Sequence, residues 1–366
     1  MNDRPFEPRE MQARLDAVRR WMADNERDAL YVTHPPNVRY LSGFRGEPAA
    51  LFVDHDRAIL ITHDRSSRWA RAQTSTFEVI CDPDPVVHAG KLMEGPALRI
   101  GVDHHIPHTT LLSLRGAWNR HTLEPSDGIE SLRRIKSEAE IAILRDSQAI
   151  NERIFRRVLE HIRPGMTERA AQGVMLAEMA ADEAVDGPSF TPIVASAGNA
   201  WEIHHQPDST VLRQGDMVIL DLGVMHAGYA SDMTRTICLG PATDAMREIH
   251  SLVGRAQQAA FDAIRHGISA YAADAAARSV IEAAGHGSAF THGLGHGIGL
   301  ETHDAGLRMS PSARDTELRN GMAVTVEPGV YLEDRFGVRT EDVVIVREDG
   351  IDNLTTFTHE LIELPT

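Results

Sequence analysis

The chain has 366 residues, of which 42% are hydrophobic and 25% are charged, and its formal net charge is −16. This length suits two domains, and the acidic balance argues against a surface that binds nucleic acid. No apolar run approaches the roughly 18 residues that a transmembrane helix needs, and the polar N-terminus does not resemble a signal peptide. We therefore expect a cytoplasmic protein that binds neither nucleic acid nor membrane. Its two cysteines, Cys81 and Cys238, lie in strand-like apolar segments, where we expect both to be buried and reduced.

The first third of the chain alternates helix and strand signals. Residues 9–25 carry apolar side chains at helical spacing, which predicts an amphipathic helix. This alternation predicts a smaller α/β domain, which we assign to residues 1–130. Short strands are expected at residues 28–34, 50–54, 57–63, 77–81 and 98–102.

The remaining residues, 131–366, are expected to form a second, α+β domain. Ser137 and Glu140 have the spacing of a capping box at the start of a long helix, and Thr167 is expected to cap the next helix. Each of two helix pairs is followed by signals for an antiparallel hairpin, which suggests two similar halves. The second helix pair is expected at about residues 244–266 and 270–284.

The hairpin predicted at residues 216–238 carries two aspartates. Asp221 lies in the apolar run VILDLG and Asp232 in YASDMTRT, on either side of a turn near residues 226–227. Because both aspartates are about equally far from this turn, we expect them to lie nearly opposite each other on paired strands. A carboxylate inside an apolar strand has a large desolvation cost unless a partner compensates its charge.

A second hairpin, predicted at residues 322–346, repeats this arrangement with glutamates. Glu327 lies in VTVEPGVY and Glu341 in GVRTEDVVIV, on either side of the turn-like residues 333–335. A single acid in a strand is more often an edge or turn residue than a metal ligand. Two hairpins that each present two acids are hard to explain as surface decoration.

A glycine- and histidine-rich segment, THGLGHGIGLETH, contains His296 and His303. The glycines could suggest a phosphate-binding loop, but no Lys–Ser/Thr pair follows them. We expect instead that glycine lets the backbone pass close to bound metals. Four carboxylates and one imidazole suit two divalent cations that activate a shared water.

The motifs DLG, SDMTRT, HGLGH, EPGVY and VRTED occur in the order found in the metallopeptidases of the pita-bread fold. The chain resembles this family, which includes prolidase, aminopeptidase P, methionine aminopeptidase and the metal-free creatinase, over about its last 230 residues. The stretch THPPNVRYLSGF is similar to the creatinase/prolidase N-terminal domain. The resemblance implies a pita-bread catalytic domain behind a creatinase-like N-terminal domain, and a homodimer.

The resemblance also implies the metal site. It implies two divalent ions per subunit, with manganese as the first expectation and cobalt, zinc or iron as alternatives. The ligands that it implies are Asp221, Asp232, His296, Glu327 and Glu341.

Further residues receive substrate-binding and catalytic roles from the resemblance. Glu327 would take a proton from the attacking water, and His303 would stabilise the developing oxyanion. His204 would contact the proline or carboxyl end of the substrate. Its distance in the sequence from the strand that carries Asp221 favours it over His205. Arg339 would hold a ligand carboxylate, and Thr234 would hydrogen-bond a ligand acid. On sequence alone, the alternatives are that His204 and His205 are loop histidines and that Arg339 is a charge on a strand face.

The resemblance implies a peptidase that acts on peptides with proline at the second position. Our first expectation is an Xaa-Pro dipeptidase, or prolidase. The alternatives are an Xaa-Pro aminopeptidase that acts on longer peptides, and a non-peptide hydrolase or lyase of the same fold. A catalytically inactive binding module is disfavoured because all five implied ligands are present.

Overall fold

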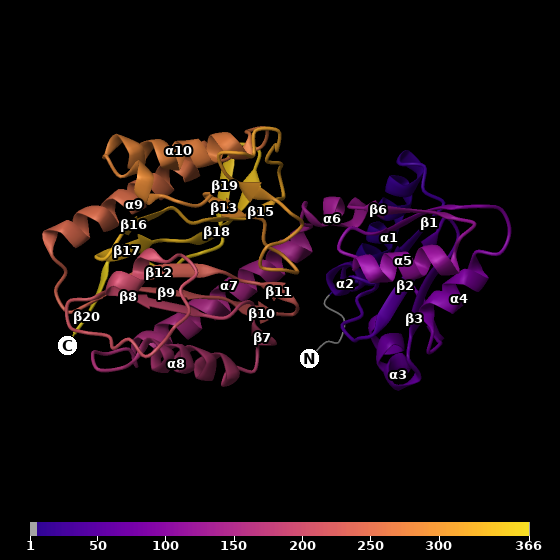
Figure 1. Ribbon diagram of the computed structural model, residues 1–366, viewed down its shortest axis with the longest axis horizontal. Coiled ribbons are helices and arrows are strands. Elements are labelled where there is room, and N and C mark those ends of the chain that lie inside the picture. The colour runs from indigo at the N-terminus through magenta and orange to yellow at the C-terminus, as the bar shows by residue number, and fades with distance from the viewer. Residues whose placement is uncertain (1–5, 366) are drawn as a thin grey trace. The chain divides into compact units, whose positions relative to one another are not determined.

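The structure is a computed structural model that describes residues 6–365, and it divides into two compact units, Met1–Arg133 and Arg134–Thr366 (Figure 1). This division falls close to the expected domain boundary after residue 130. The exact position of that boundary stays a prediction. No helix within residues 6–365 is both long and apolar enough to cross a membrane.

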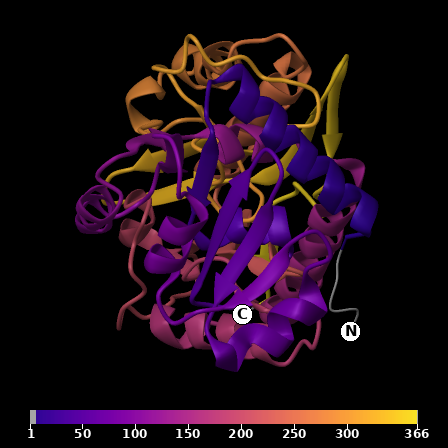
Figure 2. The same ribbon diagram turned by 90° about the vertical axis from the view of Figure 1, so that its right-hand side faces the viewer.

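A six-stranded mixed sheet forms the centre of the first unit (Figure 2). Its strands are β1 (Ala29–Val32), β2 (Ala49–Asp54), β3 (Ala58–Thr62), β4 (Glu78–Cys81), β5 (Arg99–Asp103) and β6 (Thr122–Ser126). Their order is β4-β3-β2-β1-β5-β6, and β1 pairs antiparallel with β2 and parallel with β5. The helices are α1 (Pro8–Asp24), α2 (Pro35–Ser42), α3 (Asp64–Gln73), α4 (Pro85–Leu92), α5 (His108–Ala117) and α6 (Gly128–Arg133).

The five strands and the first helix predicted for this unit are confirmed. Strand β6 was not predicted, because its sequence TLEPS contains proline and glutamate, which are uncommon in strands. The prediction that Cys81 is buried is wrong: Cys81 ends the edge strand β4 and is exposed. Cys238, by contrast, is buried as expected.

The second unit begins with two helices and a four-stranded sheet of order β20-β12-β9-β8. The α7 helix starts with the predicted capping box of Ser137 and Glu140, and Thr167 caps α8 as predicted. The elements of this half are α7 (Glu138–Leu159), α8 (Glu168–Ala180), β7 (Gly187–Pro188), β8 (Ile193–Ser196), η1 (Ala197–Trp201), β9 (Met217–Leu222), β10 (Val224–His226), β11 (Tyr229–Ala230), β12 (Met233–Leu239) and β20 (Ile362–Leu364).

The other half repeats this plan with a helix pair over a three-stranded sheet of order β15-β18-β19. The predicted helix pair is confirmed. Its elements are α9 (Asp244–Ala263), α10 (Ala270–Ala283), η2 (Gly287–Ala289), β13 (Gly295–His296), β14 (Arg308–Met309), β15 (Ala323–Val326), β16 (Gly329–Leu332), β17 (Phe336–Arg339), β18 (Asp342–Arg347) and β19 (Gly350–Asn353).

Each half of the second unit has its own apolar core between its helix pair and its sheet. Side chains of α7, α8, β9 and β12 form one core, and side chains of α9, α10, β15 and β18 form the other. The sheets lie between the two helix pairs in Figure 1. The halves meet where Thr236 of β12 exchanges hydrogen bonds with the backbone of Arg339 in β17. The acid-bearing strands therefore come together between the two cores.

The turn of the first hairpin is centred one residue later than expected, between Ala227 and Gly228. Ala227 and Gly228 both have positive φ, 45° and 77°, and they connect the paired residues His226 and Tyr229. Positive φ at both central residues is the geometry of a type I′ hairpin turn. The ladder therefore pairs Asp221 with Thr234 rather than with Asp232.

Asp232 still lies close to Asp221, because residues two apart on a strand share a face. In the second hairpin both ladders follow a single register, which places Glu327 opposite Glu341 as predicted.

Candidate functional site

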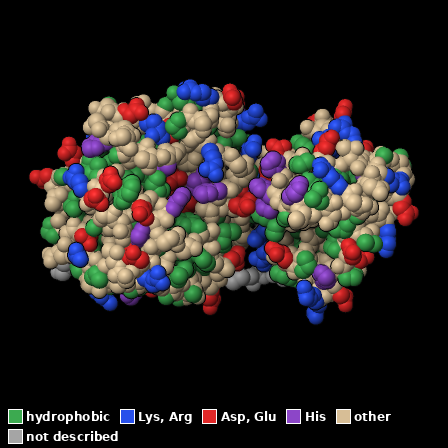
Figure 3. Space-filling model, in the orientation of Figure 1, with side chains coloured by type: hydrophobic (Ala, Val, Ile, Leu, Met, Phe, Trp, Pro, Cys, Tyr) green, Lys and Arg blue, Asp and Glu red, His purple; other side chains and the backbone are tan. Residues whose placement is uncertain are grey.

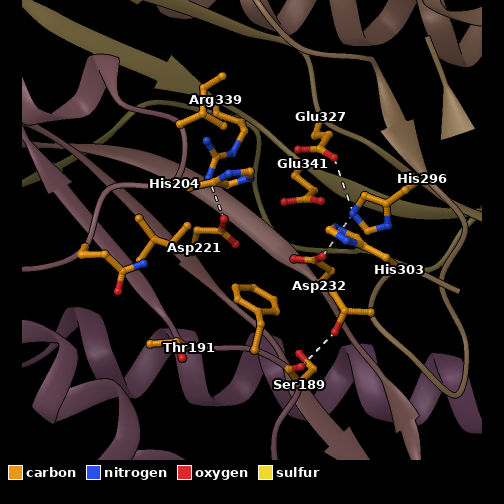
Figure 4. A pocket seen from close by; sticks show the side chains of 15 residues that line it. Ser189, Thr191, His204, Asp221, Asp232, His296, His303, Glu327, Arg339 and Glu341 are labelled. Carbon is orange, nitrogen blue, oxygen red and sulfur yellow. Dashed lines mark hydrogen bonds and ion pairs between the residues drawn. The ribbon is translucent and has the colours of Figure 1, made fainter. Parts of the chain in front are cut away.

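A cavity of about 340 Å³ in the second unit gathers the acids of both hairpins (Figure 4). All five expected ligands line it, together with His204, His303 and Arg339. Histidine and acidic side chains also lie next to one another on the face of this unit shown in Figure 3. The structure thus brings together every residue that the sequence analysis assigned to the site. The five expected ligands are Asp221, Asp232, His296, Glu327 and Glu341.

Three of these side chains lie close to one another. Asp232, His296 and Glu341 each offer a ligand atom within 4.8 Å of the others. His296 Nε2 lies 3.7 Å from Asp232 Oδ2 and 3.5 Å from Glu327 Oε1. His296 Nδ1 lies 3.1 Å from the Gly297 carbonyl oxygen, to which only a protonated nitrogen can donate. In the neutral ring, this bond leaves the Nε2 lone pair directed at the carboxylates, as a metal-binding imidazole requires.

Arg339 fixes the acid on β9. Its Nη2 donates a 2.6 Å hydrogen bond to Asp221 Oδ2, and its Nε donates to Thr234 Oγ1 at 3.1 Å. Thr234 Oγ1 in turn donates to Glu341 Oε2 at 2.7 Å. Both hydrogen bonds to ligand acids expected from the sequence, one from Arg339 and one from Thr234, are therefore present. Together they hold Asp221 and Glu341 in fixed orientations.

Burial of several acids in one place changes their protonation. Desolvation raises the pKa of Asp232 well above its ordinary value, and the charges of Asp221 and Glu327 raise it further. Desolvation, with Asp232 as the next cause, raises the pKa of Glu341 in the same direction. Desolvation also raises the pKa of Glu327 to about 8. Without added positive charge, these carboxylates cannot all remain ionised at neutral pH.

The donor set fits divalent cations. Asp221 Oδ1 is buried and, among residues 6–365, has no hydrogen-bond partner, although a buried carboxylate oxygen normally has one. Burial lowers the pKa of His296 to about 3, so the imidazole is neutral at physiological pH. Carboxylate oxygens with one neutral imidazole nitrogen are a donor set that manganese, iron, cobalt and zinc accept.

The two histidines expected to contact substrate both line the cavity. The His303 ring packs edge-on against His296, with 4.2 Å between ring centroids. In Figure 4 the His204 ring lies next to Arg339 and Asp221, across the carboxylates from His296 and His303. His205, the rejected alternative, is buried away from the cavity and bonds to Glu168.

An apolar wall completes the cavity. Phe190, Ile193 and Ile203 contribute it, and Gln206, close to Ile203 and His204 in the sequence, also lines the cavity. These residues follow no motif of charge or spacing, and the sequence analysis did not select them. Only their position beside the acid-bearing strands identifies them.

Two further residues extend the network behind Arg339. Tyr331 OH accepts a hydrogen bond from Arg339 Nη1 at 3.1 Å and lies 2.8 Å from His292 Nε2. Burial raises the pKa of Tyr331 to about 12 and lowers that of His292 to about 3. Both residues lie within the motifs HGLGH and EPGVY. The sequence therefore marks these segments as important, but it does not indicate that Tyr331 and His292 contact each other or Arg339.

The glycines beside His296 serve the neighbouring backbone. A Cβ on Gly295 would fall 2.0 Å from the Thr325 carbonyl oxygen, and one on Gly297 would fall 2.7 Å from that of Asp304. Glycine at these two positions therefore lets the backbone pack against β15 and against the backbone of Asp304. The expected approach of this backbone to bound metals stays a prediction.

Comparisons with known proteins agree with this geometry. Residues 142–348 match metallopeptidase family M24, and residues 14–135 match the creatinase/prolidase N-terminal domain. An Xaa-Pro dipeptidase from Lactobacillus delbrueckii is 32% identical over 365 residues, which cover 96% of this chain and 99% of that protein.

Solved structures show the same fold. An Xaa-Pro dipeptidase from Bacillus anthracis superposes with a TM-score of 0.91 at 31% identity, covering 97% of this chain and all of that one. An X-Pro aminopeptidase from Thermotoga maritima gives a TM-score of 0.86 at 29% identity, over 93% of this chain and 98% of that one. The predicted fold class, a pita-bread domain behind a creatinase-like domain, is confirmed. The chain belongs to metallopeptidase family M24 and is a peptidase of that family.

Proposed function

We propose that this protein hydrolyses the bond between an amino acid and a following proline, with dipeptides as its main substrates. The observation that carries this proposal is the convergence of five ligand-type side chains on one cavity with an apolar wall and two histidines. Similarity over nearly the full chain to proteins named Xaa-Pro dipeptidase supports the substrate class. In this proposal two divalent cations bind to Asp221, Asp232, His296, Glu327 and Glu341.

Two divalent cations bound to these ligands would supply charge that polarises the scissile carbonyl and lowers the pKa of a water molecule. We assign to Glu327 the acceptance of the proton from the attacking water and its delivery to the leaving proline nitrogen. His303, at the cavity wall beside His296, would donate a hydrogen bond to the oxyanion that forms at the carbonyl. Arg339 and Thr234 would keep Asp221 and Glu341 in place throughout.

The proline end of the substrate would face the apolar side of the cavity. A proline ring buries hydrocarbon and offers no N–H group, so it suits a wall made by Phe190, Ile193 and Ile203. His204, which also lines the cavity, would contact the carboxyl end of the dipeptide. This orientation leaves the first residue of the substrate next to the carboxylates.

The test is hydrolysis of Ala-Pro, Ala-Pro-Ala and Ala-Ala by metal-stripped protein, before and after addition of manganese. We expect manganese-dependent cleavage of Ala-Pro and no cleavage of Ala-Ala. Absence of cleavage of all three peptides, with the bound metal quantified by mass spectrometry, would contradict the proposal. It would point to a non-peptide substrate.

A second candidate is an Xaa-Pro aminopeptidase, and the similarity to the Thermotoga maritima enzyme supports it. The two activities differ in whether the site requires a free carboxylate directly after proline. Faster cleavage of Ala-Pro-Ala than of Ala-Pro would establish this second candidate.

We further propose manganese as the native metal, a homodimer, and a cytoplasmic location. Mixed oxygen and nitrogen donors accept several divalent ions, so metal supply contributes to the choice. Metal analysis of protein purified without added metal tests the first proposal, and sedimentation in solution tests the second. Fractionation of the native host tests the third.

A further inference from the structure

A second buried carboxylate, outside the expected ligand set, gathers one segment of the chain. Glu168 is the first residue of α8, and 0% of its surface is exposed. Its Oε1 accepts hydrogen bonds from the Ser196 backbone nitrogen at 2.8 Å and from Ser196 Oγ at 2.7 Å. Its Oε2 lies 2.7 Å from His205 Nε2, and Asn199 Nδ2 lies 3.2 Å from both oxygens. These donors all belong to residues 196–208.

This group does not have the character of a metal site. Glu168, His205 and Asp208 do offer ligand atoms within 4.8 Å of one another. A carboxylate has only acceptor atoms, so His205 Nε2 must carry a hydrogen toward Glu168. The oxygens of Glu168 are therefore already bonded to several donors, and a cation would have to displace them. The contacts of Glu168 organise the chain.

The segment that Glu168 holds is the one that carries His204. Ile203, His204 and Gln206 line the cavity, while His205 points to Glu168 and is buried. Within the described part of the chain, the His204 side chain has no hydrogen bond or ion pair of its own. Its position in the cavity therefore depends on the backbone on either side of it.

That backbone has a conformation that needs support. Ala197, directly after Ser196, has φ of 46°, in the left-handed region that a residue with a side chain adopts at a cost. The following turn η1 lies against β17, where a Cβ on Gly337 would fall 2.0 Å from the Ala200 carbonyl oxygen. The segment is thus packed against β17 and held by the hydrogen bonds of Glu168.

We propose that Glu168 is a positioning residue for His204, acting through Ser196 and His205. The carboxylate fixes the backbone of residues 196–208, so that the His204 side chain faces the substrate. This inference rests on the proposed function for the role of His204. The anchoring of the segment itself is independent of that role.

The test compares Glu168→Ala, Glu168→Gln and His204→Ala with the double variant Glu168→Ala/His204→Ala, using Ala-Pro as substrate. A misplaced contact residue can lower kcat/KM by about tenfold to a hundredfold, and we expect such a loss in Glu168→Ala, chiefly through KM. Because Glu168 acts through His204, the double variant should be no worse than His204→Ala. Equal losses in both backgrounds would overturn the proposal.

Glu168→Gln provides a graded variant. Glutamine keeps one oxygen for Ser196 but presents an amide nitrogen to His205, which must then accept through Nε2. The proton can move to His205 Nδ1, which lies 3.6 Å from Glu202 Oε2. We therefore expect partial recovery of kcat/KM relative to Glu168→Ala. No recovery in a folded variant would contradict the hydrogen-bonding argument.

A matched control separates positioning from general loss of a buried carboxylate. Glu152 is also buried and holds Thr356, whose segment contributes nothing to the cavity lining. Hydrogen exchange of residues 196–208 should accelerate in Glu168→Ala and stay unchanged in Glu152→Ala. Unchanged exchange in Glu168→Ala would overturn the anchoring. If the wild-type protein fails to cleave Ala-Pro while this exchange difference appears, the proposed function fails and the anchoring stands.

Discussion

The second unit contains two groups of acids and histidines that resemble each other in geometry. Asp232, His296 and Glu341 form one, and Glu168, His205 and Asp208 form the other; each group offers three ligand atoms within 4.8 Å of one another. They differ in their hydrogen bonds. Glu168 receives donors on both oxygens, whereas Asp232 and Glu341 lie among other carboxylates and receive few.

The difference in hydrogen bonding has an electrostatic consequence. Burial and neighbouring negative charges raise the pKa values of Asp232 and Glu341 in the first group and of the adjacent Glu327. A bound cation would reduce the repulsion among these carboxylates. In the Glu168 group, N–H and O–H donors already compensate the charge. Close ligand atoms therefore do not identify a metal site by themselves. Buried carboxylate oxygens that lack donors, such as Asp221 Oδ1, are the better indication.

The largest expected effect comes from removal of one of the five expected metal ligands. His296→Ala or Glu327→Ala should abolish hydrolysis of Ala-Pro, because each change removes a proposed metal ligand that lines the cavity. Activity, metal content by mass spectrometry and circular dichroism are measured together, and we expect a native spectrum. Near-native turnover in either variant, with metal still bound, would contradict the site assignment.

Removal of the metal should make stability depend on pH in a specific direction. The pKa of Glu327 rises from 4.5 to about 8 in the folded chain, so between these values the folded state binds more protons than the unfolded state. The stabilisation by the protonated carboxyl is complete below pH 4.5 and is lost as the pH rises through about 8. Chelator-treated protein should therefore unfold at a lower urea concentration at pH 9 than at pH 6. The free energy of unfolding should be lower at pH 9 by a few kcal/mol.

Glu327→Gln is the control for this pH effect. An uncharged amide of the same size cannot titrate, so the chelated variant should lose much of the slope between pH 6 and pH 9. With manganese present, the slope of the wild-type protein should reverse, because cations bind deprotonated carboxylates. A midpoint of the chelated wild-type protein that rises over this interval would contradict the electrostatic description.

Much of the expected ligand set could be predicted from sequence, because its signal is local. An acid within a run such as VILDLG is conspicuous, and the turn between two strands sets which residues face each other. The register of the first hairpin was wrong by one position at the turn because Ala227 adopts positive φ, which the sequence HAG does not indicate. Asp221 consequently pairs with Thr234, whose hydroxyl donates a hydrogen bond to Glu341.

The Glu168 group could not be predicted, because its signal is distributed. Glu168 looks like an ordinary acid in the first turn of a helix, where it also suits the helix dipole. Its partners lie 28 to 37 residues away in the sequence, in a segment without regular periodicity. Only tertiary structure reveals that a buried carboxylate gathers these donors. The apolar wall of the cavity escaped prediction for the same reason.

A smaller effect should follow from Arg339→Lys. Arginine donates to Asp221, Thr234 and Tyr331 at once, and a single ammonium group cannot reach all three from the same backbone position. Loss of a group that orients a ligand typically costs about 10- to 100-fold in metal affinity or activity. Manganese titration followed by activity measures this change. An unaltered titration curve would show that Arg339 does not orient Asp221 in solution.

The smallest effect is expected at the exposed member of the second group, and it tests the comparison most directly. Asp208 has ligand atoms near Glu168 and His205, but its Oδ1 accepts a hydrogen bond from the Thr210 backbone nitrogen at 2.6 Å. Asp208→Asn keeps that acceptor and removes the charge, so metal stoichiometry should not change and activity should stay within about twofold. If this variant instead bound fewer ions per subunit than the wild-type protein, the Glu168 group would be a metal site. Saturation of carboxylate oxygens by donors would then fail as the criterion that separates the two groups.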